Sequence, residues 1–279
     1  MTDRSVLRLR DAAAGFGART LWSGLDLDVV RGEFLAVLGA NGTGKTTLLR
    51  SILGLQTLRN GTLEIDGRPP RRGSGAVGYV PQERTLDPRA PIIAREFVAL
   101  GLDGNRWGIG RPSAARRRAI DEALTGAGAG ALADVSIGRL SGGEGQRVRI
   151  AQAIATDPSL LLCDEPLVSL DLRGQAEIAA LIDRRRTEHG TAVVFVTHEI
   201  NPVLPYVDRV LYLAGGRFKL GTVDEVMTSA SLTALYDSPV EVIRSAGRIL
   251  VAGMPDHHAG HHDHDSHRAH DASYEGTPS

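Results

Sequence analysis

Gly39-Ala40-Asn41-Gly42-Thr43-Gly44-Lys45-Thr46 is the stretch that decides the fold. It matches the pattern G-x-x-x-x-G-K-[ST], in which glycines let backbone N–H groups converge on phosphate oxygens. The apolar run at 34–38 is typical of a buried strand, and residues 47–53 have the pattern of a helix. In this context we expect Lys45 to reach the β- and γ-phosphates of a nucleoside triphosphate and the Thr46 hydroxyl to bind magnesium. An ordinary glycine-rich turn is the competing interpretation, and the match at all four fixed positions argues against it.

The composition limits what kind of protein this is. The chain has 279 residues with 32 basic and 33 acidic side chains, so no overall field draws it to nucleic acid or to anionic lipid. The single cysteine, Cys163, excludes an internal disulfide framework and favours a reducing compartment. No apolar run approaches the roughly 18–20 residues of a membrane span, and no signal-peptide pattern follows Met1. We expect a cytosolic chain that leaves any membrane crossing to another subunit.

An apolar run at 160–163 leads directly into two carboxylates, Asp164 and Glu165. If this run is a strand of the same sheet, its carboxyl end places Asp164 beside the Mg²⁺ held by Thr46. Glu165, one residue further, could then polarise a water molecule facing the γ-phosphate. Acidic pairs are common in loops, and it is the coupling to the phosphate-binding loop that favours a catalytic interpretation.

Two more strand ends carry polar residues of interest. A strand predicted at 76–80 is followed by Gln82, and the apolar run 192–197 by His198. Each has a plain alternative, because a glutamine in a loop is usually solvated and a histidine at a strand end is more often structural. At the sheet edge that holds Asp164, His198 becomes a candidate sensor of the γ-phosphate.

A second glycine-rich stretch, Leu140-Ser141-Gly142-Gly143-Glu144, opens a helix predicted to run to about residue 156. Ser141 and Glu144 have the spacing of a capping box. Two glycines at the first helical positions weaken a helix, so capping alone explains them poorly. They are explained if this helix end must approach an anion closely. Further on, Asp171 is expected to cap a charged helix at 172–188.

The remaining segments are assigned from their periodicity. Alternating residues at 5–11 and 25–29 predict an antiparallel β layer ahead of the phosphate-binding loop. Phe16 lies between them, where its ring could stack on a purine or simply belong to a turn.

A helical insert at about 91–138 contains a glycine- and alanine-rich stretch, predicted to be flexible, at 125–133. Its arginines at 116–118 are better explained as a solvated helix face than as a nucleic-acid contact. An edge strand is predicted at 61–67, after the helix that follows the phosphate-binding loop. The C-terminal part is predicted to contain strands at 208–213 and 217–220, a short helix at 222–228 and an apolar stretch at 240–252.

The C-terminal tail is rich in histidine and aspartate and lacks aliphatic side chains, so we expect it to be disordered. Imidazoles interleaved with carboxylates suit Zn²⁺, Ni²⁺ or Cu²⁺, and loose multi-site metal binding is preferred to a merely solubilising tail. The histidines in question are His257, His258, His261, His262, His264, His267 and His270.

Together these motifs resemble the nucleotide-binding subunits of ATP-binding cassette (ABC) transporters over about residues 5–225. The resemblance implies an α/β fold, with a P-loop NTPase core of the RecA-like type, an N-terminal antiparallel β layer and an α-helical subdomain inserted at about 91–156. A C-terminal extension at 226–254 and the histidine-rich tail at 255–279 would follow.

The same resemblance implies a role for each motif. Phe16 would stack on the base of ATP, although tyrosine is usual there, and residues 39–46 with Thr47 would hold the phosphates. Thr46, Gln82 and Asp164 would bind Mg²⁺. Glu165 would be the catalytic base and His198 the switch histidine, with Gln82 contacting the attacking water.

The resemblance also implies partners. Two copies would sandwich two ATP molecules, with Leu140, Ser141, Gly142, Gly143 and Glu144 contacting the γ-phosphate held by the other subunit and Asp171 in the D-loop. The homodimer would drive membrane-spanning permease subunits from the cytoplasmic face of the membrane, with a substrate-binding protein if it imports. No nucleic-acid partner is expected.

The cargo is predicted from shorter stretches. Gly78-Tyr79-Val80-Pro81-Gln82 and residues 235–240 are similar to subunits of bacterial zinc and manganese importers, and the histidine tail agrees. A transition metal is therefore expected, zinc first and manganese second. The alternatives are an ABC transporter ATPase for a non-metal substrate, a soluble ABC ATPase of translation or DNA repair, and a metal-binding regulator with a vestigial ATPase site. A single cassette, a short insert and balanced charge disfavour the soluble class, and the complete motif set disfavours the regulator.

Overall fold

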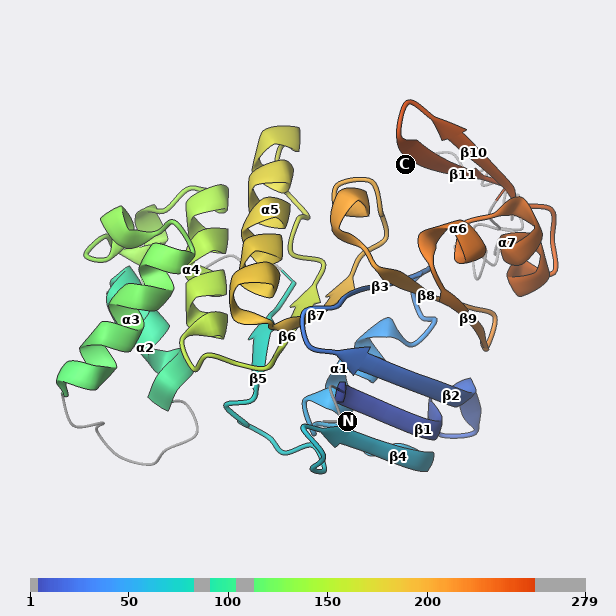
Figure 1. The fold of residues 1–279 in the computed structure, drawn as a ribbon, viewed down its shortest axis with the longest axis horizontal. Coiled ribbons are helices and arrows are strands. Elements are labelled where there is room, and N and C mark those ends of the chain that lie inside the picture. Colours follow the sequence, from blue (N-terminus) through green and yellow to red (C-terminus); the bar gives the residue numbers. More distant parts are fainter. Residues whose placement is uncertain (1–4, 83–90, 104–112, 254–279) are drawn as a thin grey trace, which may run out of the picture.

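The structure is a computed structural model that describes residues 5–82, 91–103 and 113–253. Among these residues, no helix combines the length and the apolar composition that crossing a bilayer requires. The described chain contains a core sheet, an antiparallel sheet, a group of helices beside them and a C-terminal extension (Figure 1).

The core sheet has six strands in the order β5-β6-β7-β3-β8-β9. The first five are parallel, and β9 returns antiparallel to β8. Because the carboxyl ends of parallel strands meet at one edge, the residues that follow β3, β5, β6 and β7 are brought together. The strands are β3 (Phe34–Gly39), β5 (Val77–Val80), β6 (Leu160–Asp164), β7 (Ala192–Val196), β8 (Arg209–Ala214) and β9 (Arg217–Gly221).

The predicted antiparallel layer is confirmed, with strand order β2-β1-β4. Helix α1 (Lys45–Ile52) packs between this layer and one face of the core sheet, where Leu48, Leu35 and the fully buried Trp22 share one apolar cluster. The strands are longer than the alternation predicted because register shifts break the period along β1. They are β1 (Ser5–Phe16), β2 (Arg19–Val30) and the edge strand β4 (Asn60–Ile65).

A group of helices lies beside the core sheet and packs on it through α4 (Figure 1). The prediction that residues 125–133 are flexible is wrong. Ala127 and Ala129 are fully buried, and the Ala129 N–H donates to Leu124 O at 2.7 Å. Small side chains let these turns pack closely, which composition alone does not distinguish from flexibility. The elements are α2 (Ala94–Asp103), α3 (Ala114–Gly126), η1 (Gly130–Leu132), η2 (Ile137–Arg139) and α4 (Gly142–Ile154).

Helix α5 (Leu172–His189) covers the opposite face of the sheet from α1, and the C-terminal extension follows β9. The helix predicted at 222–228 is only the first of two, because Thr228 caps a second helix by accepting from Ser231 N–H. The sequence missed that second helix. The elements of this part are η3 (Leu204–Tyr206), α6 (Val223–Val226), α7 (Ser229–Tyr236), and the hairpin of β10 (Glu241–Ser245) with β11 (Arg248–Ala252).

Candidate active site

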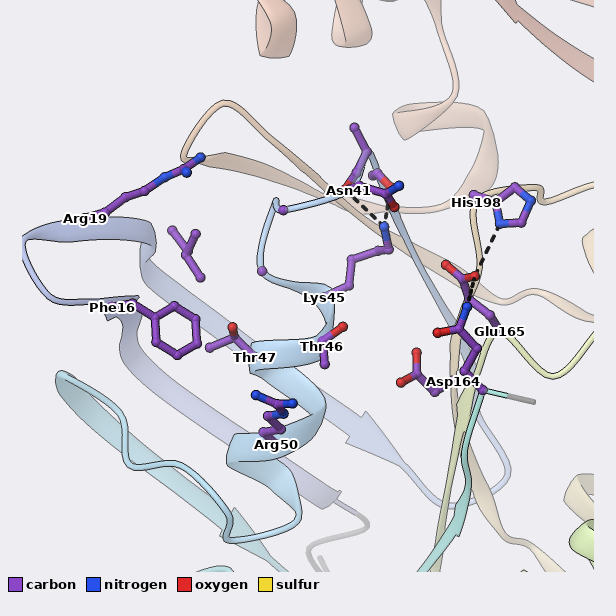
Figure 2. Close-up of a pocket in the computed structure, with 16 residues that line it drawn as sticks. Phe16, Arg19, Asn41, Lys45, Thr46, Thr47, Arg50, Asp164, Glu165 and His198 are labelled. Carbon is purple, nitrogen blue, oxygen red and sulfur yellow. Dashed lines mark hydrogen bonds and ion pairs between the residues drawn. The ribbon is translucent and has the colours of Figure 1, made fainter. Parts of the chain in front are cut away.

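A cavity of about 1000 Å³ opens at the carboxyl edge of the core sheet (Figure 2). Its lining joins segments that are far apart in sequence. Of the residues predicted for the nucleotide, for magnesium and for catalysis, all but Thr43 line it: Phe16, Gly39, Ala40, Asn41, Gly42, Gly44, Lys45, Thr46, Thr47, Gln82, Asp164, Glu165 and His198. Thr43 turns into its own loop and donates to Ala40 O at 2.9 Å.

The backbone of the phosphate-binding loop needs its glycines. Gly39 has φ 140° and Gly44 has φ 103°, both in the left-handed range that side chains disfavour. A Cβ on Gly39 would lie 2.2 Å from Leu213 O, and one on Gly44 would lie 2.7 Å from Trp22 Nε1. Gly44 is also the N-cap of α1 and supplies no capping side chain, so the first N–H groups of the helix stay available for an anion in the cavity.

Lys45 is buried at the start of α1 with its ammonium inside the loop. Its Nζ donates to Gly39 O at 2.5 Å and to Ala40 O at 3.0 Å. Burial lowers the pKa of this ammonium, and the charges of Glu165 and Asp164 oppose that shift. A partly desolvated cation held only by carbonyls gains from an incoming polyanion, so the cavity favours phosphate at this point.

Asp164 ends β6 with a buried carboxylate that faces the cavity. Burial and the neighbouring Glu165 raise its pKa, against the opposing effects of Tyr79, Lys45 and Arg50. The Tyr79 hydroxyl donates to Asp164 Oδ2 at 3.3 Å. With the Thr46 hydroxyl and the Gln82 amide in the same cavity, the available ligands are hard oxygens, which fit Mg²⁺.

Two side chains, each from the end of a neighbouring strand, approach one oxygen atom of Glu165. Its Oε2 accepts from Gln82 Nε2 at 3.3 Å and lies 3.7 Å from His198 Nδ1 (Figure 2). Glu165 has φ 47°, unusual for a residue with a side chain, and its N–H donates to Val196 O at 2.9 Å. The backbone is therefore held in a disfavoured conformation by β7 while the carboxylate faces the cavity.

The far end of the cavity is formed by the β1–β2 hairpin. Phe16 is 54% exposed at the end of β1, and its ring leaves a flat apolar surface beside the loop. Arg19 is its cross-strand partner and lines the cavity with Leu21. Sequence reasoning missed Arg19, Leu21, Tyr79 and the Arg50 of α1. The pairing of Phe16 with Arg19 could have been predicted from the sequence, because the two alternating segments on either side of these residues predict a hairpin.

The second glycine-rich helix end lies outside this cavity. Ser141 accepts from Glu144 N–H at 3.4 Å, and the Glu144 carboxylate accepts from Ser141 N–H at 2.9 Å, so the predicted capping box is confirmed. Leu140 packs partly against the core while Ser141 and Gly142 are exposed. Asp171 caps α5, as predicted, by accepting from Gly174 N–H at 2.8 Å.

The described residues hold no cluster of three or more His, Cys, Asp or Glu side chains that could bind a metal ion. The seven histidines of the tail lie outside the described residues. Cys163 is fully buried in the core, and burial raises the pKa of its thiol, which keeps it unreactive.

This combination of fold and cavity defines an ATPase of the ABC class. The family model described as ABC transporter matches residues 22–168, more than half of the chain, and the chain belongs to this family. It binds ATP through this domain and is an enzyme that hydrolyses ATP to drive transport. ABC ATPases dimerise and act with transmembrane permease subunits.

Several relatives are similar over most of the chain. The zinc import ATP-binding protein ZnuC of Halorhodospira halophila is 39% identical, covering 77% of this chain and 76% of the relative. The aliphatic sulfonates import ATP-binding protein SsuB 3 of Nocardia farcinica is 42% identical, with 77% and 80% covered. The energy-coupling factor transporter ATP-binding protein EcfA1 of Symbiobacterium thermophilum is 38% identical, with 85% and 83% covered.

Two solved structures show the same fold. A metal-chelate type ABC transporter in an inward-facing conformation matches with a TM-score of 0.75 and 28% identity, covering 88% of this chain and 96% of that one. A dimeric bacterial ABC transporter cassette matches with a TM-score of 0.65 and 29% identity, with 78% and 98% covered.

Proposed function

We propose that this chain is the ATPase subunit of an importer of a transition metal ion, with zinc as the first candidate and manganese as the second. It would work as a peripheral homodimer at the cytoplasmic face of the membrane, with permease subunits and a substrate-binding protein as partners. Six relatives of 32–39% identity that are named zinc import ATP-binding proteins support this cargo.

The observation that carries the enzymatic part is the convergence of Gln82 and His198 on Glu165 Oε2, at 3.3 and 3.7 Å, beside the phosphate-binding loop. We assign Glu165 as the base that accepts a proton from the attacking water. The amide of Gln82 orients that water, and His198 contacts the γ-phosphate. Because two side chains contact the same carboxylate oxygen, the carboxylate is already oriented before the substrate binds.

The rest of the cavity holds the nucleotide. Phe16 offers its exposed ring to the base, and residues 39–47 hold the phosphates with backbone N–H groups and the Lys45 ammonium. Magnesium would be held by Thr46, Gln82 and Asp164, and it supplies charge neutralisation of the β- and γ-phosphates when bound.

The site is half of a composite one. Leu140 to Glu144 do not line the cavity of their own chain, which supports a role at the ATP of a second subunit. We assign Ser141, Gly142 and Gly143 as donors to that γ-phosphate and Asp171 as a residue of the dimer interface. Closure of two such chains around two ATP molecules would then drive the permease.

Replacement of Glu165 by glutamine tests the base. The Glu165→Gln variant keeps the shape and loses the proton acceptor, so we expect kcat to fall by about 10²- to 10⁴-fold with ATP affinity retained. Lys45→Ala should instead weaken ATP binding by about 10- to 100-fold, the loss of a charge-assisted bond to phosphate. Steady-state ATPase rates and calorimetric binding of ATP measure both. Wild-type turnover in Glu165→Gln would remove the base assignment.

The cargo has a specific rival, because the relative with 42% identity is named for aliphatic sulfonates. Disruption of the coding sequence in the native host separates the two. A metal importer predicts lower cell zinc or manganese and growth inhibited by a chelator, restored by the added metal. Loss of growth on an aliphatic sulfonate as sulfur source, with normal metal content, would favour the rival.

The seven tail histidines are proposed to bind Zn²⁺ loosely at several sites. The full-length chain is compared by calorimetric titration of Zn²⁺, Mn²⁺ and Ni²⁺ with a full-length variant in which these histidines are serines. We expect Zn²⁺ heat in the first and little in the second. Identical titrations would leave only a solubilising tail.

A further inference from the structure

Asn201 ties the loop that carries His198 to the C-terminal hairpin. Its Nδ2 donates to Ile249 O at 2.9 Å, and its Oδ1 accepts from Ile249 N–H at 2.8 Å. One side chain thus satisfies both backbone groups of a residue 48 positions away, as a neighbouring strand would. Asn201 is half-buried and stands three residues after His198.

The loop has few other attachments. At its start, the Thr197 N–H donates to Val37 O at 3.1 Å, and the Thr197 hydroxyl closes a local turn with Glu199. His198 itself is exposed, with 62% of its side chain accessible, so packing does not fix it. The next anchors are the buried Ile200 and the two Asn201 bonds. The position of His198 relative to Glu165 therefore depends on both ends of this short loop.

The hairpin that receives Asn201 forms a sheet of its own, β10 with β11, and a lone two-stranded hairpin is marginally stable in water. It is fixed to the rest of the extension by other contacts. Thr233 Oγ1 accepts from Val240 N–H at 3.0 Å and donates to Val240 O at 3.3 Å, and Ser229 Oγ accepts from Val242 N–H at 2.9 Å. Ile249 is buried against the core. The hairpin is thus a fixed support on which the His198 loop rests.

We propose that Asn201 is a positioning residue for ATP hydrolysis, acting by holding the His198 loop against the β10–β11 hairpin. This rests on the role proposed above for His198. Without the two bonds, the loop loses its hydrogen bonds to the hairpin. It keeps its attachment at Thr197, the packing of Ile200 and the bonds of the next turn, from Val203 N–H to Ile200 O at 3.0 Å and from Leu204 N–H to Asn201 O at 3.4 Å. These bonds do not tie the turn to the hairpin, so His198 samples positions away from the γ-phosphate. ATP binding, which uses the loop at 39–47, should be spared.

The test uses the full-length chain with a matched control. Asn201→Leu keeps the side-chain size and removes both bonds. Thr233→Val also removes a donor–acceptor pair that holds the hairpin, but it does not touch the His198 loop. We expect Asn201→Leu to lower kcat about tenfold, the scale of measured couplings between sites, with the KM for ATP changed by less than about twofold. Thr233→Val should lower the melting temperature to a similar extent and leave kcat unchanged.

A double variant completes the test. If Asn201 acts through His198, the kcat of His198→Ala with Asn201→Leu equals that of His198→Ala alone. Equal loss of kcat in Thr233→Val and Asn201→Leu would reduce the effect to general stability and overturn the inference. Wild-type kcat in Asn201→Leu, with His198→Ala inactive, would overturn the inference and keep the site assignment. Full activity in His198→Ala would overturn the proposed role of His198, and the inference with it.

Discussion

Helices α1 and α4 both begin at a glycine-rich loop, and the two helix ends are built in opposite ways. At α1 the cap is Gly44, with φ 103° and no side chain to close the helix, and the end faces a large cavity. At α4 the cap is Ser141, whose hydroxyl and backbone both pair with Glu144, and the end is exposed outside that cavity.

The difference shows what each end requires. The orphan N–H groups of α1 have no acceptor from a capping side chain, so this end is incomplete until an anion binds. At α4 the capping box pairs the N–H groups of Ser141 and Glu144 within the chain, so this end stays folded while exposed. The N–H groups of Gly142 and Gly143 take no part in the box and can bind a ligand that another subunit brings. A chain with one open and one closed helix end of this kind is consistent with half of a shared site.

We expect the largest effect on ATP binding from a methyl group placed on Gly44. Gly44→Ala forces a side chain into left-handed backbone at a cost of about 1–2 kcal/mol and directs it at Trp22 Nε1, 2.7 Å away. We expect the loss of ATP binding by about 100-fold and a lower melting temperature. Gly42→Ala is the control, because its φ of 77° carries the backbone cost but nothing lies within 4 Å of the new Cβ. Calorimetric ATP titration of both variants gives the result, and equal losses would contradict the steric explanation.

The same change at α4 should act differently. A Cβ on Gly143 meets nothing within 4 Å, so Gly143→Ala fits and stabilises the helix by up to about 1 kcal/mol. ATP binding to the chain should be unchanged. Turnover should fall about tenfold, because the proposed contact with the partner's γ-phosphate needs close approach of the helix end. Thermal unfolding and ATPase rates measure the two effects. Undiminished turnover would remove the proposed contact in trans.

The sequence predicted the elements whose chemistry is local. The phosphate-binding loop, the capping box at Ser141 and the strand ends at Asp164 and His198 are visible because the residue types and spacings carry the physical requirement. What it missed depends on distant packing. Whether alanines at 125–133 are buried or mobile is decided by the helices around them, as Ala127 shows. Tyr79 reaches Asp164 only because β5 and β6 are neighbours in the sheet.

The smallest expected effect is on stability, and it comes from the carboxyl groups near the two helix ends. Near the open end of α1, burial and Glu165 raise the pKa of Asp164 above its ordinary 3.8. At the closed end of α4, the bonds from Ser141 lower the pKa of Glu144 below its ordinary 4.5.

The two carboxyls must therefore affect stability with opposite signs. The folded chain holds a proton on Asp164 more tightly than the unfolded chain does, so stability falls as pH rises from 3.8 through the raised pKa. The Glu144 contribution is fully present above 4.5 and is lost as pH falls through the lowered pKa.

Asp164→Asn should accordingly raise the melting temperature at neutral pH, without magnesium or nucleotide, because the neutral amide avoids the cost of a buried charge. Glu144→Gln should lower it, because the amide loses a charge-assisted cap. For a chain of this size, each 1 kcal/mol moves the melting temperature by about 2–4 °C. Both differences should shrink on acidification, as the wild-type carboxyls take up protons. Thermal unfolding in a chelating buffer from neutral to acidic pH measures this. A lower melting temperature for Asp164→Asn at neutral pH would mean that Lys45 stabilises the carboxylate more than burial disfavours it. The Lys45 ammonium near the first turn of α1 would then already be paired with a carboxylate of its own chain. An incoming phosphate would stabilise it less.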